Sequence, residues 1–438
     1  MRKISLIALL LTATVSAMAS DFVKDGIYYT YDIDAMTARV CICDDYDNPP
    51  SGDIVIPATV SMGRHTFDVV AIDQNAFANA PITSVTIEGD AEHGVTSIGR
   101  NAFSYCRSLE RAVISDRVKE IDKQVFYECS ALKSVRLPDG LELIPNALCL
   151  NCTSLTTFNF PKGCRGIDDE AFRKCGFTEL HLPDNIILVG EDAFAYNKKL
   201  TKVDLGNGLK AIDYCAFQGC PITEITLPPT LQYLLDEAFA STKLTRISLP
   251  PSLIMLGPNT FAGCKLKEIV YEDGDQDLEF MYEDPLMLDN YDPAIESVYL
   301  GRNLNAAPYD YEEERVRHLT IGPLVKNLNF QFGDALETVT SYIADPAAVP
   351  EYFTNRVHAN AILYVPQEYL SDYENAATWK RFFDIRTLAE DAVGTIAADS
   401  RAAERYDLSG RRLPATAAPH GLSIIRQADG SARKVLSR

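Results

Sequence analysis

Two cysteines have a spacing that other proteins use for chemistry. Cys149 and Cys152 form a C-x-x-C pair, which occurs in thiol redox sites and supplies half of many zinc sites. A redox site needs a βαβ setting and a zinc site needs a second pair, and the sequence shows neither. We therefore predict that both thiols are structural, one as a member of a repeated pattern and the other as an incidental neighbour.

An acidic segment is the second candidate. Residues 273–279 read DGDQDLE, and alternating carboxylates can converge on Ca²⁺, which prefers oxygen ligands. The sixth place of a calcium loop requires glycine but holds Leu278, and the twelfth place holds Asp284 rather than glutamate. We therefore interpret the segment as an exposed acidic insertion and leave calcium binding as the alternative.

The sequence contains none of the short motifs of nucleotide-binding, hydrolase or metalloprotease sites. Its histidines are scattered among different segments, with no second metal ligand beside them, and we interpret each as a surface residue. They are His65, His93, His181, His318, His358 and His420. This pattern predicts a protein that is not an enzyme and needs no cofactor or metal.

A phrase that returns about every 23 residues organises the chain. It contains Ala-Phe, then a small residue or cysteine, then an apolar run that often ends in proline. The phenylalanines are Phe77, Phe103, Phe126, Phe172, Phe194, Phe217, Phe239 and Phe261. We expect Leu148 to fill the one missing place. A fixed period of this length predicts a solenoid, in which each turn buries its apolar face against its neighbours.

The segment 209–228, LKAIDYCAFQGCPITEITLP, shows what each turn contains. Its apolar residues 222, 225 and 227 predict a strand, because the side chains of a strand alternate between its two faces. Pro228 ends that strand. The same alignment predicts about twelve parallel strands, centred on Val85, Ala112, Val135, Phe158, Leu180, Val203, Ile225, Ile247, Ile269, Val298, Leu319 and Val339.

Six cysteines occupy one place in the repeat, at intervals of 23, 23, 23, 45 and 44 residues. They are Cys106, Cys129, Cys152, Cys175, Cys220 and Cys264, and the skipped places hold Asn197 and Thr242. We predict a ladder of small buried thiols rather than disulfides, because stacked side chains point in parallel and bridge poorly. For Cys41 and Cys43, a disulfide and a packed pair both remain open.

The phrase L-x-x-I-x-x-x-A-F-x-x-C-x-x-L-x-x-I-x-L-P resembles the BspA-type leucine-rich repeat family of bacterial surface and secreted proteins. The resemblance covers about residues 68–271 and continues in a degraded form to about residue 388. It implies a right-handed, β-rich leucine-rich-repeat solenoid with an N-terminal β cap and a C-terminal cap. It also implies a function in adhesion or ligand binding, without specifying the ligand.

The first 19 residues are typical of a secretory signal peptide. Arg2 and Lys3 form a basic start, residues 4–15 are an apolar run, and Ala17-Met18-Ala19 is an A-x-A cleavage site that leaves Ser20 as the new N-terminus. The apolar run is shorter than the roughly 20 residues that a transmembrane helix needs. We therefore predict an exported protein, either released or held at the cell surface, with no transmembrane segment.

The remaining boundaries follow from the repeat and from composition. The predicted segments are an N-terminal β cap (20–70), regular repeats (71–271), degenerate repeats with an acidic, Tyr-rich insertion (272–345), a C-terminal cap (346–388), a linker (389–404) and a tail (405–438). The tail resembles the short C-terminal tails of secreted Bacteroidetes proteins, some of which are sorting signals. The alternative is a disordered tail with two short strands.

The net charge of −20 makes nucleic-acid binding unfavourable. On the outward face of the predicted strands, five charges alternate in sign and would pair with one another: Glu179, Lys202, Glu224, Arg246 and Glu268. The next outward row is mostly small and polar. Candidate partner-binding residues in that row and in the insertion are Arg136, Asn159, His181, Asp204, Tyr282, Tyr291, Tyr299, Tyr309 and Tyr311.

From these features we predict an exported, non-enzymatic protein that binds another protein, either a host matrix protein or a bacterial surface protein. Two alternatives stay open. The Tyr-rich insertion could bind a glycan, because exposed tyrosine rings are suitable platforms for sugars. The chain could also be a structural component of a surface layer, in which case it would associate with itself.

Overall fold

The computed structural model describes residues 20–45, 47–281, 295–305, 316–328, 332–388, 404–406, 421–426 and 432–437. The predicted signal peptide and most of the predicted linker lie outside these residues. The chain forms two compact units. The first unit contains Met1–Thr178 and Ala193–Asn197, and the second contains Glu179–Asp192 and Lys198–Arg438.

The first unit begins with a β cap of antiparallel hairpins, as predicted. The strands are β1 (Phe22–Lys24), β2 (Ile27–Asp32), β3 (Thr37–Val40), β4 (Gly52–Ile56), β5 (Thr59–Met62) and β6 (His65–Ile72). Strands β1, β2 and β3 pair in antiparallel order, and β5 folds back on β6. Strand β4 instead runs parallel to the first repeat strand, so the repeat architecture already begins within the cap.

Each turn of the first unit contributes to two rows of parallel strands. The long-strand face consists of β7 (Ile82–Ile87), β9 (Arg111–Ile114) and β11 (Ser134–Arg136). The short-strand face consists of two-residue strands, namely β8 (Ser97–Ile98), β10 (Glu120–Ile121), β12 (Leu143–Ile144) and β13 (Gly166–Ile167). The apolar core lies between these two faces.

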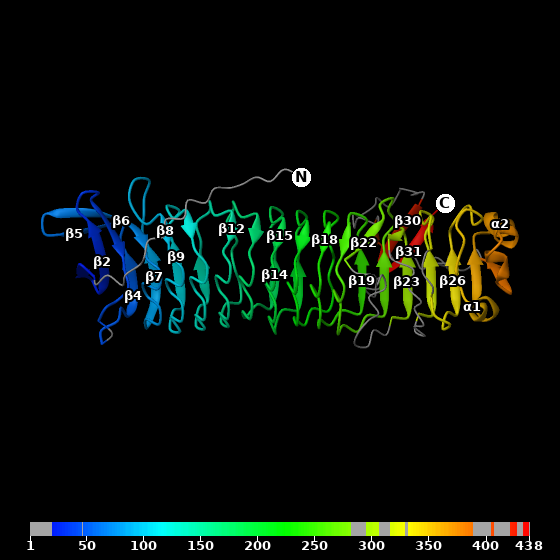
Figure 1. Cartoon of the computed structure of the whole chain (residues 1–438), viewed down its shortest axis with the longest axis horizontal. Coiled ribbons are helices and arrows are strands. Elements are labelled where there is room, and N and C mark those ends of the chain that lie inside the picture. The colour runs from blue at the N-terminus through cyan, green and yellow to red at the C-terminus, as the bar shows by residue number, and fades with distance from the viewer. Residues whose placement is uncertain are drawn as a thin grey trace. The chain divides into compact units, whose positions relative to one another are not determined.

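The second unit repeats this arrangement, and Figure 1 shows β14 and β19 in one row with β15 and β18 in the other. Its long-strand face contains β14 (Glu179–His181), β16 (Lys202–Asp204), β19 (Arg246–Leu249), β21 (Glu268–Tyr271), β23 (Ser297–Leu300), β25 (His318–Ile321), β26 (Thr338–Ser341), β27 (Ile362–Val365) and β28 (Asp384–Thr387). Its short-strand face contains β15 (Leu188–Val189), β17 (Ala211–Ile212), β18 (Tyr233–Leu234), β20 (Met255–Leu256), β22 (Leu278–Phe280) and β24 (Leu304–Asn305).

The predicted parallel β-solenoid is therefore confirmed, with differences in detail. Ten of the twelve predicted centres lie in long strands, but the segments around Phe158 and Ile225 have no assigned strand. Strands β27 and β28 continue the parallel row into the predicted C-terminal cap. The tail contains β29 (Glu404–Tyr406), β30 (Gly421–Arg426) and β31 (Ala432–Ser437), which form an antiparallel sheet.

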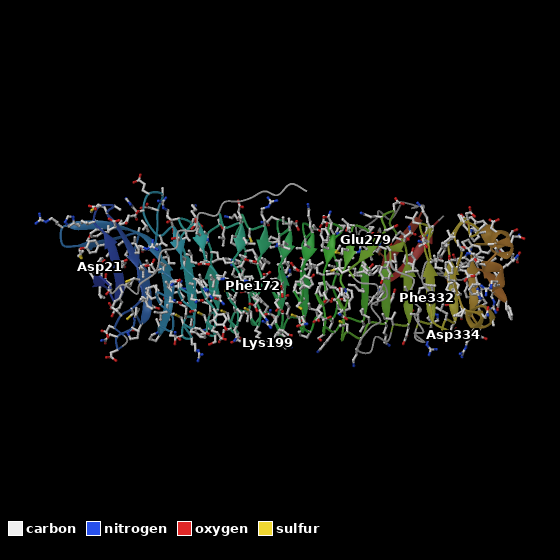
Figure 2. The ribbon with its side chains drawn as sticks, in the orientation of Figure 1. Asp21, Phe172, Lys199, Glu279, Phe332 and Asp334 are labelled. Atoms are coloured by element: carbon white, nitrogen blue, oxygen red, sulfur yellow. The ribbon has the colours of Figure 1, made fainter. Side chains whose placement is uncertain are left out.

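The repeated phenylalanines form stacks in the core. The rings of Phe77 and Phe103 lie 5.1 Å apart at 8°, and those of Phe217 and Phe239 lie 5.3 Å apart at 4°. Phe172, which Figure 2 labels, is fully buried and stacks on Phe194. Each aromatic pair contributes about 0.5–1.5 kcal/mol beyond its buried area. The rings stack only where successive turns have the same length, so stacking stabilises a solenoid with turns of constant length.

The expectation that Leu148 fills the missing aromatic place is wrong. Several core phenylalanines donate their main-chain N–H to the carbonyl of the residue that precedes the phenylalanine of the next turn, as Phe172 does to Ala193. Phe126 donates to Leu148, so Leu148 holds the alanine place and Cys149 holds the aromatic place. Cys149 N–H in turn donates to the carbonyl of Ala171 at 2.8 Å. The C-x-x-C pair is thus one aromatic-place residue followed by one ladder residue.

The turn that has the small Cys149 in the aromatic place has two unusually large residues elsewhere. Phe158 and Phe160 stand where the preceding turn has Val135 and Leu137. Both rings contact Phe172 edge-on, with centroids 4.6 and 6.1 Å away. We infer that these rings fill volume that Cys149 leaves, since protein interiors are close-packed.

Cys149→Phe and Phe158→Val should each destabilise the protein, and the double variant should recover part of the loss. We expect Cys149→Phe to cost about 1–3 kcal/mol through overpacking. We expect Phe158→Val to cost about 2 kcal/mol through a cavity. Chemical denaturation of the four proteins gives the coupling energy, which should be about 1 kcal/mol or more in favour of the double variant. Additive losses would show that the two sites do not share volume.

The C-terminal part of the second unit is closed by two short helices, α1 (Asn355–Asn360) and α2 (Leu370–Asn375). Trp379 is fully buried there, and its indole N–H donates to the carbonyl of Val349 at 2.8 Å.

His358 is also buried, which contradicts the expectation that it lies at the surface. Its Nε2 lies 3.0 Å from Oε1 of the buried Glu351, whose other oxygen accepts the N–H of Phe353. This contact gives Nε2 of His358 and Oε1 of Glu351 a buried partner, whereas Nδ1 of His358 is buried without one.

Glu351→Ala should destabilise this region by about 3 kcal/mol, because it leaves His358 and the Phe353 N–H without a buried partner. Glu374 lies exposed on α2, so Glu374→Ala is the matched control and should change stability by less than about 0.5 kcal/mol. Denaturant unfolding followed by Trp379 fluorescence measures both effects. Equal midpoints for the two variants would contradict a structural role for the pair.

Candidate functional site

Charged residues on the long-strand face pair with one another across adjacent turns. In the second unit, Arg246 on β19 lies 3.2 Å from Glu268 on β21. Glu179 and Lys202 are register neighbours on β14 and β16. Glu224 lies in the segment without an assigned strand. The alternating row is therefore satisfied within the protein where the structure pairs it, and exposed pairs of this kind contribute little stability.

The candidate residues in the first unit lie on consecutive turns. The guanidinium of Arg136 donates to the carbonyl of Ile114 at 2.7 Å and to Oδ2 of Asp116 at 2.8 Å. The hydrogen bond from Arg136 lowers the pKa of Asp116 below its usual value. Asn159 is exposed on the turn that follows Arg136. Arg136 is thus used to join turns, whereas Asn159 faces solvent.

In the second unit the structure brings His181 and Asp204 together. They are register neighbours on β14 and β16, with Nδ1 of His181 3.6 Å from Oδ2 of Asp204. Tyr299 is half-buried on β23, and its hydroxyl donates to Oδ1 of Asp273 at 2.7 Å. Burial and the Asp273 hydrogen bond raise the pKa of Tyr299. The candidates Tyr282, Tyr291, Tyr309 and Tyr311 lie outside the described residues.

The acidic segment does not gather its carboxylates. Asp273 accepts from Tyr299, Asp277 accepts from Asn303 at 2.8 Å, and Glu279 accepts from Asn305 at 2.7 Å. Leu278 is buried in β22. Across the part of the chain that the structure describes, no three side chains of His, Cys, Asp or Glu are arranged to hold a metal ion. These carboxylates are therefore used in hydrogen bonds between consecutive turns.

All eleven cysteines are free thiols, so the predicted thiol ladder is confirmed and Cys41 and Cys43 form no disulfide. Ladder thiols lie against the main-chain carbonyl of the preceding turn's aromatic place. Sγ lies 3.0–3.2 Å from the acceptor oxygen for Cys106 on Phe77, Cys129 on Phe103, Cys152 on Phe126, Cys175 on Cys149 and Cys264 on Phe239. Asn197 makes the same contact through its amide, which donates to Phe172 at 2.9 Å. Cysteine and asparagine thus both supply a small hydrogen-bond donor at this place, whereas the hydroxyl of Thr242 lies 3.0 Å from Sγ of Cys264.

Burial protects these thiols from reagents. It raises the pKa of Cys106 to about 12, and the same cause raises the pKa of Cys129, Cys149 and Cys175. Thiolate is the reactive form of cysteine, so ladder thiols should be inert. Only Cys43 and Cys215 are partly exposed among the eleven.

We expect Ellman's reagent at pH 8 to modify Cys43 readily in the native protein and to leave the ladder thiols intact. Burial and the neighbouring Glu237 raise the pKa of Cys215 to about 12, so its reaction should be slow. In denaturant the reagent should count all eleven thiols. Fewer thiols in denatured, unreduced protein would reveal disulfides and contradict the ladder.

The short-strand face of the second unit exposes a row of apolar side chains that sequence reasoning missed. Consecutive strands place Leu188, Ala211, Tyr233 and Met255 beside one another. Leu188 and Tyr233 are 37% and 39% exposed, and Ala211 and Met255 are half-buried. We call these four residues the apolar ridge. Its sequence signal is the residue just before each buried apolar residue of the short strands. In the first unit this place is held by Ser97, Glu120 and the exposed Leu143.

Carboxylates follow the ridge along its carboxyl edge. Asp213 comes directly after its short strand, and four more carboxylates come two or three residues after theirs. We call these five residues the acidic rim: Glu191, Asp192, Asp213, Asp236 and Glu237. Burial and the neighbouring Glu237 raise the pKa of Asp236, which indicates crowded negative charge. An apolar row beside a row of carboxylates is suited to a partner that is both apolar and basic.

The short-strand face of the first unit differs. It contains a groove of about 1720 Å³ along β8, β10 and β12, bordered by Arg39, Lys119, Glu120, Lys123 and Glu142. Leu143 is 44% exposed within it. Charges of both signs border this groove, so it lacks the uniform charge that would select one kind of partner. Among the described residues, no helix is long and apolar enough to cross a membrane.

Comparison with known families identifies the repeat. Residues 65–177 and 165–280 match the family described as "BspA type Leucine rich repeat region (6 copies)". No curated protein matches the sequence.

Three solved structures are similar to the chain. A leucine-rich repeat protein from Bacteroides ovatus is 20% identical, with a TM-score of 0.49 over 84% of this chain and 100% of that one. A leucine rich cell surface protein from Faecalibacterium prausnitzii is 17% identical, with a TM-score of 0.38 over 87% and 97%. The pneumococcal vaccine antigen PcpA is 16% identical, with a TM-score of 0.43 over 85% and 99%.

Proposed function

Because the chain belongs to the BspA-type leucine-rich repeat family through residues 65–280, we propose that it is an exported scaffold that binds another protein at the cell surface. The family match and the stacked turns support a binding role, since a solenoid offers an extended surface for partners. The A-x-A site before Ser20 supports export. In this proposal the protein performs no chemistry and needs no cofactor.

One observation carries the proposal. The long-strand face of the second unit pairs its charges within the protein, whereas the short-strand face leaves apolar side chains exposed to water. On the long-strand face, charges such as Arg246 and Glu268 pair within the protein. On the short-strand face, the apolar ridge keeps Leu188 and Tyr233 in contact with water. Burial of exposed apolar area drives association, whereas paired surface charges add little. The ridge is therefore the surface that gains most from a partner.

The acidic rim specifies the chemistry of that partner. A protein that covers the ridge must bring its own apolar side chains, and lysine or arginine at their margin would meet the carboxylates of the rim. Long-range attraction between such surfaces speeds encounter and weakens as salt increases. We therefore propose a basic, amphipathic protein surface as the partner, with the long-strand candidates His181 and Asp204 outside the contact.

The test is binding of the purified chain to an array of matrix proteins, bacterial surface proteins and glycans. Leu188→Ser and Tyr233→Ser should each weaken a protein hit about tenfold, the loss expected for residues at the centre of an interface. Raising sodium chloride from 50 to 500 mM should weaken the same hit through screening. Binding curves by surface plasmon resonance measure both effects.

Tyr352 is 53% exposed in the C-terminal part of the unit, so Tyr352→Ser is the matched control and should bind normally. Loss of binding on His181→Ala or Asp204→Ala, with Tyr233→Ser unaffected, would move the site to the long-strand face. A glycan hit would instead favour the alternative function at the Tyr-rich insertion. Concentration-dependent self-association without any hit would favour a surface-layer component.

A further inference from the structure

Ser20 is tied to the N-terminal cap by three contacts to one carboxylate. Its main-chain N–H donates to Oδ2 of Asp44 at 2.9 Å. Its hydroxyl lies 3.3 Å from Oδ1 and 3.1 Å from Oδ2 of the same residue. The next residue, Asp21, donates its N–H to the carbonyl of Tyr29 at 2.8 Å, just before β1 pairs with β2. These contacts hold the main chain at Ser20 against the segment that follows β3.

The same residue follows the A-x-A site at residues 17–19. A signal peptidase acting there adds water across the Ala19–Ser20 peptide bond. The carbon–nitrogen bond breaks, the water oxygen completes a carboxylate on Ala19, and the nitrogen of Ser20 takes up both protons of the water to become an ammonium group. An amide nitrogen offers one hydrogen atom to Asp44, whereas an ammonium group offers three hydrogen atoms and a positive charge.

We propose that Asp44 is a preformed receptor for the ammonium group that cleavage at Ala19–Ser20 creates, so that processing itself completes the N-terminal cap. The proposal rests on the export that the proposed function includes. It assigns a role to Asp44 that is independent of the partner-binding surface.

The electrostatic surroundings favour a cation at this point. Asp21 and Asp44 both lie close enough to the buried thiol of Cys41 to raise its pKa, although burial is the larger cause. Asp45 belongs to the same segment, and its carboxylate accepts the side-chain amide of Asn48. The thiol of Cys43 donates to the carbonyl of Asp45 at 3.0 Å. Arg39, on β3, is already paired with Asp73. The basic side chain on β1 is Lys24, which is exposed.

Binding of the ammonium group by Asp44 would also stabilise strand β1. It lies at the end of the sheet order β1-β2-β3-β6, so its outer edge has no strand beside it in the described part of the chain. Unpaired edges are sites of fraying and of aggregation. An ammonium group held by Asp44 fixes the start of β1 against the segment that follows β3.

The first experiment expresses the full chain in an exporting Gram-negative host and measures the intact mass and the N-terminal sequence. We expect a chain that begins at Ser20. The pKa of its α-amino group is then followed by pH-dependent labelling or by NMR. It should lie roughly 0.3–0.7 units above the ordinary value of about 7.7–8.0, the shift expected for an exposed ion pair. Asp44→Asn should abolish the shift.

A stability measurement gives a second readout. The α-amino pKa is raised in the folded state, so the added stability is present below about pH 7.7 and is lost as pH rises through the folded value. At pH 6 the processed protein should therefore melt above its Nα-acetylated form, and at pH 10 the two should coincide. In Asp44→Asn protein the difference at pH 6 should disappear.

Asp34 lies exposed in the turn between β2 and β3, so Asp34→Asn is the matched control and should leave the shift in place. Retention of residues 1–19 would overturn both export and this inference. Cleavage at another bond would overturn the inference and leave export standing. Cleavage at Ser20 with an α-amino pKa that is indifferent to Asp44→Asn would overturn the receptor role alone.

Discussion

The structure depends on main-chain hydrogen bonds that join the aromatic segments of consecutive turns. In one turn, Asn101, Phe103 and Tyr105 each donate an N–H to the next turn, at 3.2, 3.0 and 2.7 Å. Asn101 and Tyr105 adopt left-handed conformations, with φ of 56° and 60°, and the same pair of positions is left-handed in most turns. Non-glycine residues rarely hold this conformation, so the bonds between turns must offset its cost.

This constraint explains why other features recur with a fixed period. Alternate N–H groups of one turn donate to carbonyls of the next turn, so the backbones of consecutive turns must lie directly over one another. Side chains at equivalent places in consecutive turns are therefore stacked, and identical side chains stack best. The phenylalanine stacks, the thiol ladder and the paired charges of the long-strand face are three consequences of the same backbone match. The apolar ridge is a fourth, formed where the equivalent place faces water.

The sequence was informative where one residue type marks one place. Phenylalanine and cysteine identify the core ladder, and alternation of apolar residues identifies most long strands, because those patterns reflect burial directly. It was misleading at Leu148, since a leucine beside an alanine fits the aromatic place as well by composition as Cys149 does. The hydrogen bond from Phe126 to Leu148 distinguishes the two alignments. The spacing agrees with it, because Cys149 precedes its ladder residue by three places, as Phe126 precedes Cys129.

The rest could not be predicted for physical reasons. The short strands contain two or three residues each, too few for a period to be recognised, so the sequence did not reveal the face that bears the apolar ridge. The burial of His358 depends on Glu351 and on α1, which are irregular elements outside the repeat. The outward rows of the long strands were predicted by residue, but which charges pair depends on the register between turns.

The hydrogen bonds between turns give the row of repeats a direction. Main-chain N–H groups donate towards the following turn, as Phe77 does to Ala102, whereas ladder side chains donate towards the preceding turn, as Cys106 does to Phe77. The first turn has Ala80 in the ladder place, where no earlier phenylalanine carbonyl awaits a donor. Any later turn meets the same carbonyl behind it and the same donors ahead. Whole repeats can therefore be duplicated or lost in evolution without leaving an unmatched group, while a change of a few residues within a turn cannot.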